Sequence, residues 1–176
     1  MTRLRVTLCL LVLSVWLAVQ TPARAYEEQA SIDAALGYVL VTGSDNLPRH
    51  GASLALGASY GLTETLTLRG DAAYLALIDD DDTVSGGRAR VEALYLFDVL
   101  QVVPFVGLGL DVLAAEGASG SVRVRPGAHL VLGADYLVSR TWTLGFDVRS
   151  ALYLERSGPM HATEIALRVG RMFETF

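Results

Sequence analysis

The sequence predicts an all-β protein: an eight-stranded antiparallel up-and-down transmembrane β-barrel with a polar, ion-paired interior. Segments of roughly 10 residues alternate between apolar and small or charged side chains, the pattern of strands that face lipid on one side and a lumen on the other. Long and short connections also alternate along the chain. Barrels of this class have long loops at one end and tight turns at the other.

The segment 142–155, W-T-L-G-F-D-V-R-S-A-L-Y-L-E, carries this pattern most clearly. Trp142, Leu144 and Phe146 fall on one face of an extended chain, because side chains of a strand alternate between faces. Asp147 and Arg149 fall on the other face, in the middle of the strand. We therefore expect charged side chains to point into the barrel.

Residues that disfavour strands place the boundaries in the first half of the chain. The segment G-S-D-N-L-P-R-H at 43–50 predicts the first loop, Gly61–Glu64 a tight turn, and Asp79–Asp82 with Gly86-Gly87 the next loop. Between these breaks the apolar positions recur at every second residue. The first four strands are expected at residues 29–41, 52–60, 65–77 and 88–97.

The second half repeats this arrangement. A turn at 98–102 precedes the fifth strand, and a loop at 115–121 precedes the sixth. A turn at Ser139-Arg140 precedes the seventh strand, and a loop at 156–161, which contains Gly158-Pro159, precedes the eighth. His50 and His161 fall in predicted loops. The last four strands are expected at residues 103–113, 122–136, 142–155 and 162–173. An even number of antiparallel strands closes without a free edge.

The first 25 residues are expected to be a secretory signal peptide. Arg3 and Arg5 precede an apolar run at 6–19, and Ala23-Arg24-Ala25 forms an A-x-A cleavage site. The barrel domain would then comprise residues 26–176. Without the arginines of the signal it has 11 basic against 19 acidic residues, a net charge of −8 that disfavours nucleic acid as a partner.

The inward face is expected to hold an interior polar network. Enclosed charges need partners, and an eight-stranded barrel is just wide enough to be filled by side chains. An ion-paired filling is therefore preferred over an ion path, and Arg69 is the expected partner of Glu92. The network comprises Asp33, Arg69, Asp71, Arg88, Arg90, Glu92, Asp111, Arg123, Arg125, His129, Asp135, Asp147, Arg149, Glu164 and Arg168.

Aromatic residues on the outward face are expected to form two membrane girdles. Rings at two depths mark the two membrane interfaces of a barrel. Most of these residues fall near the tight-turn ends of the strands, whereas Tyr38 and Tyr74 fall near the long loops. The girdle residues are Tyr38, Tyr60, Tyr74, Tyr95, Phe97, Tyr136, Trp142 and Phe173.

Patterns for metal or catalytic chemistry are weak. The chain has no H-E-x-x-H segment, and Asp79–Asp82 lacks the spacing of a calcium loop. No catalytic residue, metal site or cofactor is predicted. Inward leucines, namely Leu75, Leu77, Leu94 and Leu96, would add apolar constrictions near the two ends of the barrel.

The chain resembles the small outer-membrane barrels of the OmpA, OmpX and OmpW kind. The resemblance rests on the A-R-A site, the eight alternating strands, the turn motif Y-G-L-T-E-T-L-T-L at 60–68 and the terminal Phe176. It implies a multi-pass protein of the outer membrane of a Gram-negative-type bacterium. Phe176 departs from the usual pattern, because Phe173 and Phe176 have opposite parity on a regular strand.

The expected function is a structural or surface-interaction role in the outer membrane, without catalysis. One alternative is a narrow pore or carrier for ions or small apolar molecules. A second is a lipid-modifying enzyme with a Ser/His pair on the lipid-facing surface, for which no outward histidine in mid-strand is predicted. Expected partners of the monomer are outer-membrane lipid, lipopolysaccharide and the outer-membrane assembly machinery.

Overall fold

The computed structural model describes residues 29–43, 47–78, 83–97, 101–116, 121–155 and 158–174. The predicted signal peptide, the Asp79–Asp82 segment and Phe176 lie outside these residues. No helix within the described ranges is long and apolar enough to cross a membrane.

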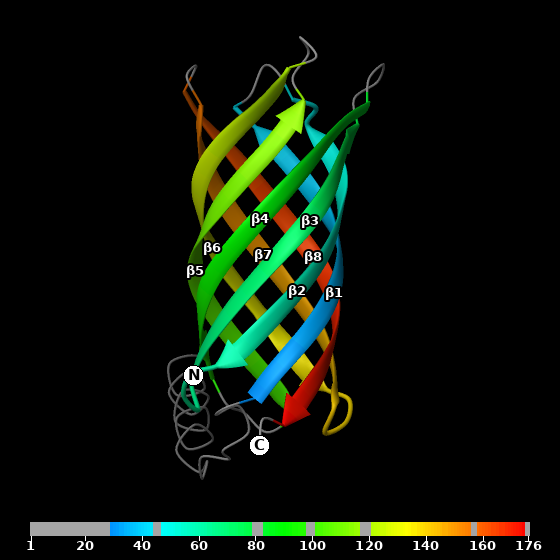
Figure 1. Cartoon of the computed structure of the whole chain (residues 1–176), viewed down its shortest axis with the longest axis vertical. Helices are drawn as coiled ribbons and strands as arrows, with labels where there is room; N and C mark the ends of the chain where they lie inside the picture. Colours follow the sequence, from blue (N-terminus) through cyan, green and yellow to red (C-terminus); the bar gives the residue numbers. More distant parts are fainter. Residues whose placement is uncertain are drawn as a thin grey trace, which may run out of the picture.

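Eight antiparallel strands form one closed barrel, which confirms the predicted fold class. Each strand pairs with the next along the chain, and β1 pairs with β8, so no strand edge is left open. Figure 1 shows the strands tilted against the long axis of the barrel. Their bounds are β1 Gln29–Thr42, β2 His50–Gly61, β3 Leu66–Ile78, β4 Thr83–Leu96, β5 Val102–Glu116, β6 Val122–Leu137, β7 Trp142–Glu155 and β8 Gly158–Glu174.

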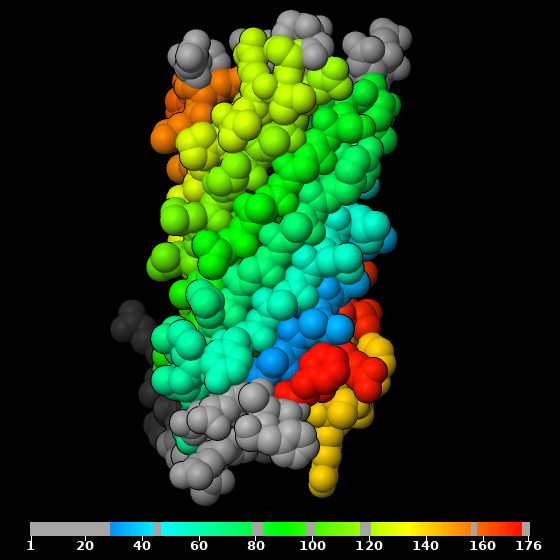
Figure 2. Space-filling view, viewed as in Figure 1, coloured from blue at the N-terminus to red at the C-terminus, as the bar shows by residue number. Residues whose placement is uncertain are grey.

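The barrel has two unlike ends. We call the end where β1 begins and β8 finishes the terminal end, and the opposite one the loop end; the terminal end is the lower one in Figure 1. The wall shown in Figure 2 is a continuous surface of tilted bands. The lumen is therefore reached from the ends and not between the strands of this face.

The strand register fixes the height of each residue in the wall. Following cross-strand partners once around the barrel from Ala30 leads back to β1 at Leu40, so the strands are staggered by ten residues in total. Leu108 lies half-way along this row and hence at mid-height. Leu144 is the third residue of β7 and lies near the terminal end.

Several strands extend further toward the loop end than the sequence predicts. β4 begins at Thr83 and β8 at Gly158, although Gly86-Gly87 and Gly158-Pro159 were expected in loops. The backbone ladder continues through these residues, as the pairing of Gly87 with Tyr74 shows. Ladder hydrogen bonds thus outweigh the local preference of glycine and proline for turns.

Two apolar clusters fill the ends of the lumen. The terminal-end cluster contains Leu94, Leu96, Val103, Phe105 and Val131. The loop-end cluster is larger, and Met160, Leu77 and Tyr153 in it are at most 1% exposed. The predicted constrictions at the inward leucines are therefore present, one pair in each cluster. The loop-end cluster comprises Val39, Val41, Leu47, Leu75, Leu77, Leu113, Ala115, Ala151, Tyr153, Met160 and Ala162.

Candidate functional site

Glu92 is the centre of the charged layer between the two apolar clusters. Its side chain is fully buried and accepts hydrogen bonds from the Arg69 guanidinium, from His129 Nε2 at 2.8 Å and from Arg149 Nη2 at 3.3 Å. Arg69 and Glu92 are direct cross-strand partners, as the sequence predicts. Arg149 also donates to Asp147 on its own strand. One carboxylate thus links β3, β4, β6 and β7.

Glu164 forms a second centre in the same layer. Arg88 Nη2 donates to both of its carboxylate oxygens at 2.7 Å, and Arg90 Nη1 donates at 2.5 Å. Ser53 adds a hydroxyl donor at 2.5 Å. Arg90 Nε also donates to Asp71 at 2.9 Å. Charge-assisted bonds of this kind are stronger than neutral ones, so the layer holds its side chains in fixed positions.

His129 lies between two carboxylates. Its Nε2 atom bonds Glu92, and its Nδ1 atom lies 2.9 Å from Asp111 Oδ1 without the alignment of a hydrogen bond. Tyr153 donates to the other oxygen of Asp111 at 2.9 Å. The residue is therefore part of the interior polar network and joins the charged layer to the loop-end cluster.

Inward glycines allow these side chains to meet across an intervening strand. Glu92, Gly109 and His129 occupy one row on β4, β5 and β6. A Cβ atom at position 109 would lie 2.5 Å from His129 Cε1 and 2.7 Å from Glu92 Cβ. Gly145 separates Asp135 and Arg168 in the same way, and these two pair at 2.6 Å. The network thus depends on space that glycine provides.

Two of the predicted interior arginines belong to the rim of the loop end. The Arg123 side chain is 46% exposed and lies 3.6 Å from Glu155, and the buried Arg125 bonds the same carboxylate at 3.1 Å. Arg123 and Arg125 thus share the partner Glu155 at the rim. In the rest of the lumen, five arginines and His129 face the seven carboxylates Asp33, Asp71, Glu92, Asp111, Asp135, Asp147 and Glu164.

Three participants were missed in the sequence. Tyr153 and Glu155 share the face of Asp147 and Arg149 by strict alternation along β7, and this parity could have identified them. Ser53 joins the network through Glu164 and was not among the predicted residues. Small hydroxyl residues give no sequence signal for such a contact, because their partner comes from a distant strand.

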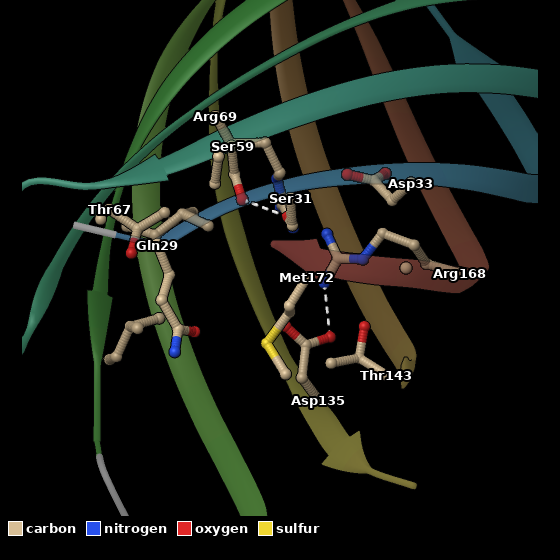
Figure 3. Close-up of a pocket in the computed structure, with 15 residues that line it drawn as sticks. Gln29, Ser31, Asp33, Ser59, Thr67, Arg69, Asp135, Thr143, Arg168 and Met172 are labelled. Atoms are coloured by element: carbon tan, nitrogen blue, oxygen red, sulfur yellow. Dashed lines mark hydrogen bonds and ion pairs between the residues drawn. The ribbon is translucent and has the colours of Figure 1, made fainter. Parts of the chain in front are cut away.

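A cavity of about 50 Å³ lies in the lumen at the terminal end. Figure 3 shows Asp33, Arg69, Arg168 and Asp135 around it, with the guanidinium of Arg168 directed toward Asp135. Strands from almost the whole circumference contribute to its lining, among them β1, β3 and β8. Asp33 and Asp135 are only partly buried, so solvent reaches them through the lumen.

The outward face carries the eight girdle residues. Each of these side chains is between 41% and 57% exposed. Leucines and valines are exposed on the same outward face. Tyr38 and Tyr74 lie toward the loop end and bond His50 at 2.5 Å and Ser85 at 2.8 Å. The tyrosine hydroxyls therefore have polar partners on the outer face, which suits the interface of a membrane.

Two histidines lie in strands and not in the predicted loops. His50 begins β2, and His161 is on β8 with its side chain on the outward face. His161 Nε2 lies 2.8 Å from Ser150 Oγ on β7. His161 therefore lies on the outward face near the beginning of β8 and not in mid-strand, because β8 begins earlier than its glycine and proline suggested. Among the described residues, no carboxylate contacts the His161 ring.

The arrangement of the interior side chains fits an ion-paired network better than a metal site. Within the described ranges, no group of three His, Asp or Glu side chains is placed to share a metal ion. The network pairs each carboxylate with guanidinium or imidazole groups, with the exception of Asp33, for which the described residues give no hydrogen bond or ion pair.

Comparisons with known proteins agree with this architecture. A closed barrel of eight strands with an apolar outer face and charged lumen defines the class of small outer-membrane barrels. Residues 9–173 match the family described as outer membrane protein beta-barrel domain, and the chain belongs to this family. The predicted resemblance to small outer-membrane barrels is thereby confirmed. A comparison with curated protein sequences finds no match.

Solved structures show the same fold at low sequence identity. Neisserial surface protein A aligns with a TM-score of 0.67 and 18% identity, covering 85% of this chain and 100% of that protein. The N-terminal β-barrel domain of Pseudomonas aeruginosa OprF gives 0.65 and 18%, covering 84% and 98%. The outer membrane enzyme PagL gives 0.53 and 18%, covering 78% and 97%. These similarities concern the fold.

Proposed function

We propose that this protein is a closed, monomeric outer-membrane barrel with a structural or surface-interaction role. The observation that carries the proposal is the filled lumen: a charged layer held by Glu92 and Glu164 lies between two apolar clusters. An ion crossing the barrel would have to displace enclosed ion pairs and then pass buried leucines. Such a path offers no wide column of water.

The outward side chains of the barrel support a membrane environment. Aromatic side chains at two depths fit a membrane-spanning belt, and polar pairs such as Tyr38–His50 at the loop end fit the level of lipid headgroups. We infer export through the signal peptide, insertion by the outer-membrane assembly machinery, and contact with outer-membrane lipid and lipopolysaccharide. The terminal end would then face the periplasm.

Planar-bilayer conductance of the purified protein tests the closed lumen. We expect small, intermittent currents that rise when Arg69→Ala opens the charged layer. Arg123→Ala is the matched control, because it removes the same group at the exposed rim. Steady, porin-sized currents from the unaltered protein would contradict the proposal and favour a narrow pore or carrier.

A second candidate function is hydrolysis of a lipid ester. The Ser150–His161 pair supports it, since a hydroxyl within hydrogen-bond distance of an imidazole can be activated as a nucleophile. Against it, the backbone N–H groups of β7 and β8 lie in a regular ladder, and a serine nucleophile needs free donors for the oxyanion. Release of fatty acid from mixed phospholipid and lipopolysaccharide vesicles, lost in Ser150→Ala and retained in Ser85→Ala, would favour the enzyme.

A further inference from the structure

One charged residue interrupts the apolar outward face of β8 near the terminal end. The outward positions along this strand include Ile165, Leu167, Val169, Arg171 and Phe173. The Arg171 side chain is exposed, and its cross-strand partners are Ile32 on β1 and Trp142 on β7. Within the described ranges it is the one arginine on the outward face of a strand. A lipid-facing charge is tolerated only near a membrane interface, so Arg171 marks such an interface at the terminal end.

Two aromatic rings hold the guanidinium of Arg171 in place. Its Cζ atom lies 5.9 Å from the centre of the Trp142 ring and 5.3 Å from the centre of the Phe173 ring, both within the range of a cation–π contact. Trp142 is itself fixed by the turn before it, where its amide donates to Ser139 Oγ at 3.1 Å and the backbone of the turn bonds β8 at 2.8 Å. Figure 2 shows the end of β8, in red, beside this turn, in yellow. The guanidinium is therefore presented at a defined position on the outside of the barrel.

The described residues leave the hydrogen-bond donors of Arg171 unused. They give this side chain no hydrogen bond and no ion pair, whereas the arginines of the lumen each pair with a carboxylate, as Arg69 does with Glu92. The rings of Trp142 and Phe173 carry no oxygen that could accept the five N–H donors of a guanidinium. These donors are therefore available to a partner outside the protein.

We propose that Arg171 binds the phosphate group of an anionic phospholipid at the terminal-end membrane interface. The planar guanidinium matches phosphate oxygens in a bidentate contact, and aromatic girdles lie at the level of the lipid headgroups. The described residues place no carboxylate in contact with Arg171 that could hold the ammonium group of a zwitterionic headgroup, which favours a lipid of net negative charge. The inference rests on the membrane role proposed above and names the lipid group that this site contacts.

Quenching of Trp142 fluorescence by brominated lipids tests this contact. The full chain carries Trp16→Phe, which leaves Trp142 as its single tryptophan, and is folded into phosphatidylcholine vesicles. The probes are phosphatidylglycerol and phosphatidylcholine with brominated acyl chains, compared at equal fractions of the lipid. The relative binding constant beside Trp142 should be about 5-fold higher for phosphatidylglycerol, the effect of one arginine at an anionic membrane surface.

Substitution of Arg171 assigns the preference to its guanidinium. Arg171→Gln in the same chain should abolish the preference for phosphatidylglycerol, and Arg171→Lys should keep part of it, because the charge remains but the planar fork is lost. Arg49→Gln is the matched control: it removes the same charge from an exposed residue at the loop end and should leave the preference unchanged.

The outcomes separate this inference from the proposed function. Equal quenching by the two lipids in the Trp16→Phe chain, or equal preference in Arg171→Gln and Arg49→Gln, would overturn the phosphate contact alone. Absence of quenching by either lipid would overturn the membrane-facing outer surface as well. The comparison of the two lipids decides the question even where Arg171→Gln does not fold.

Discussion

Replacement of Glu92 by leucine removes the acceptor on which the charged layer depends. Arg149 keeps Asp147 and His129 stays beside Asp111, but Arg69 loses the only ion pair that the described residues give it. The Glu92 side chain is fully buried, so water cannot replace it. Loss of one partner of an enclosed pair costs about 3–5 kcal/mol, and we expect Glu92→Leu to lower the free energy of unfolding by this amount.

Urea unfolding of the protein in lipid vesicles, followed by tryptophan fluorescence and by the gel mobility of the folded form, measures this change. Glu116→Leu is the control, because Glu116 is exposed at the loop end of β5; surface changes usually stay within about 0.5 kcal/mol. The double variant Arg69→Met/Glu92→Leu should recover part of the loss, because it removes the unpaired guanidinium. Equal stability of Glu92→Leu and Glu116→Leu would refute the reasoning.

Two further substitutions test depth and space. Leu108→Arg at mid-height should lower the free energy of unfolding in vesicles by about 2–4 kcal/mol, because a lipid-facing charge is most costly at the midplane. Leu144→Arg near the terminal end should lower it by only about 0–1 kcal/mol. Equal losses for the two variants in the same urea titration would contradict the assigned register. Gly109→Val should cost about 1–3 kcal/mol by overpacking the contact between Glu92 and His129. Gly87→Val on the outward face should be milder, because a Cβ atom there would meet only Ala73 O at 4.0 Å.

The sequence by itself determined which residues face the lumen and which face the outside. A strand has a period of two, so one correctly placed alternation assigns every side chain along it. Asp147 and Arg149 in β7, and the outward Trp142 and Leu144, follow from that rule. The closed barrel of eight strands followed in turn, because eight such segments with alternating long and short connections leave no other way to satisfy the strand edges.

The tertiary structure alone decided which inward residues meet. The contact of Glu92 with His129 spans three strands and depends on the stagger around the barrel and on the space at Gly109. The exposure of Arg123 depends on its height in the wall, and so does the lack of an ion pair to Asp33 among the described residues. Alternation encodes the face of a residue but not its height or its neighbours across the lumen, because these follow from the register of all eight strands together.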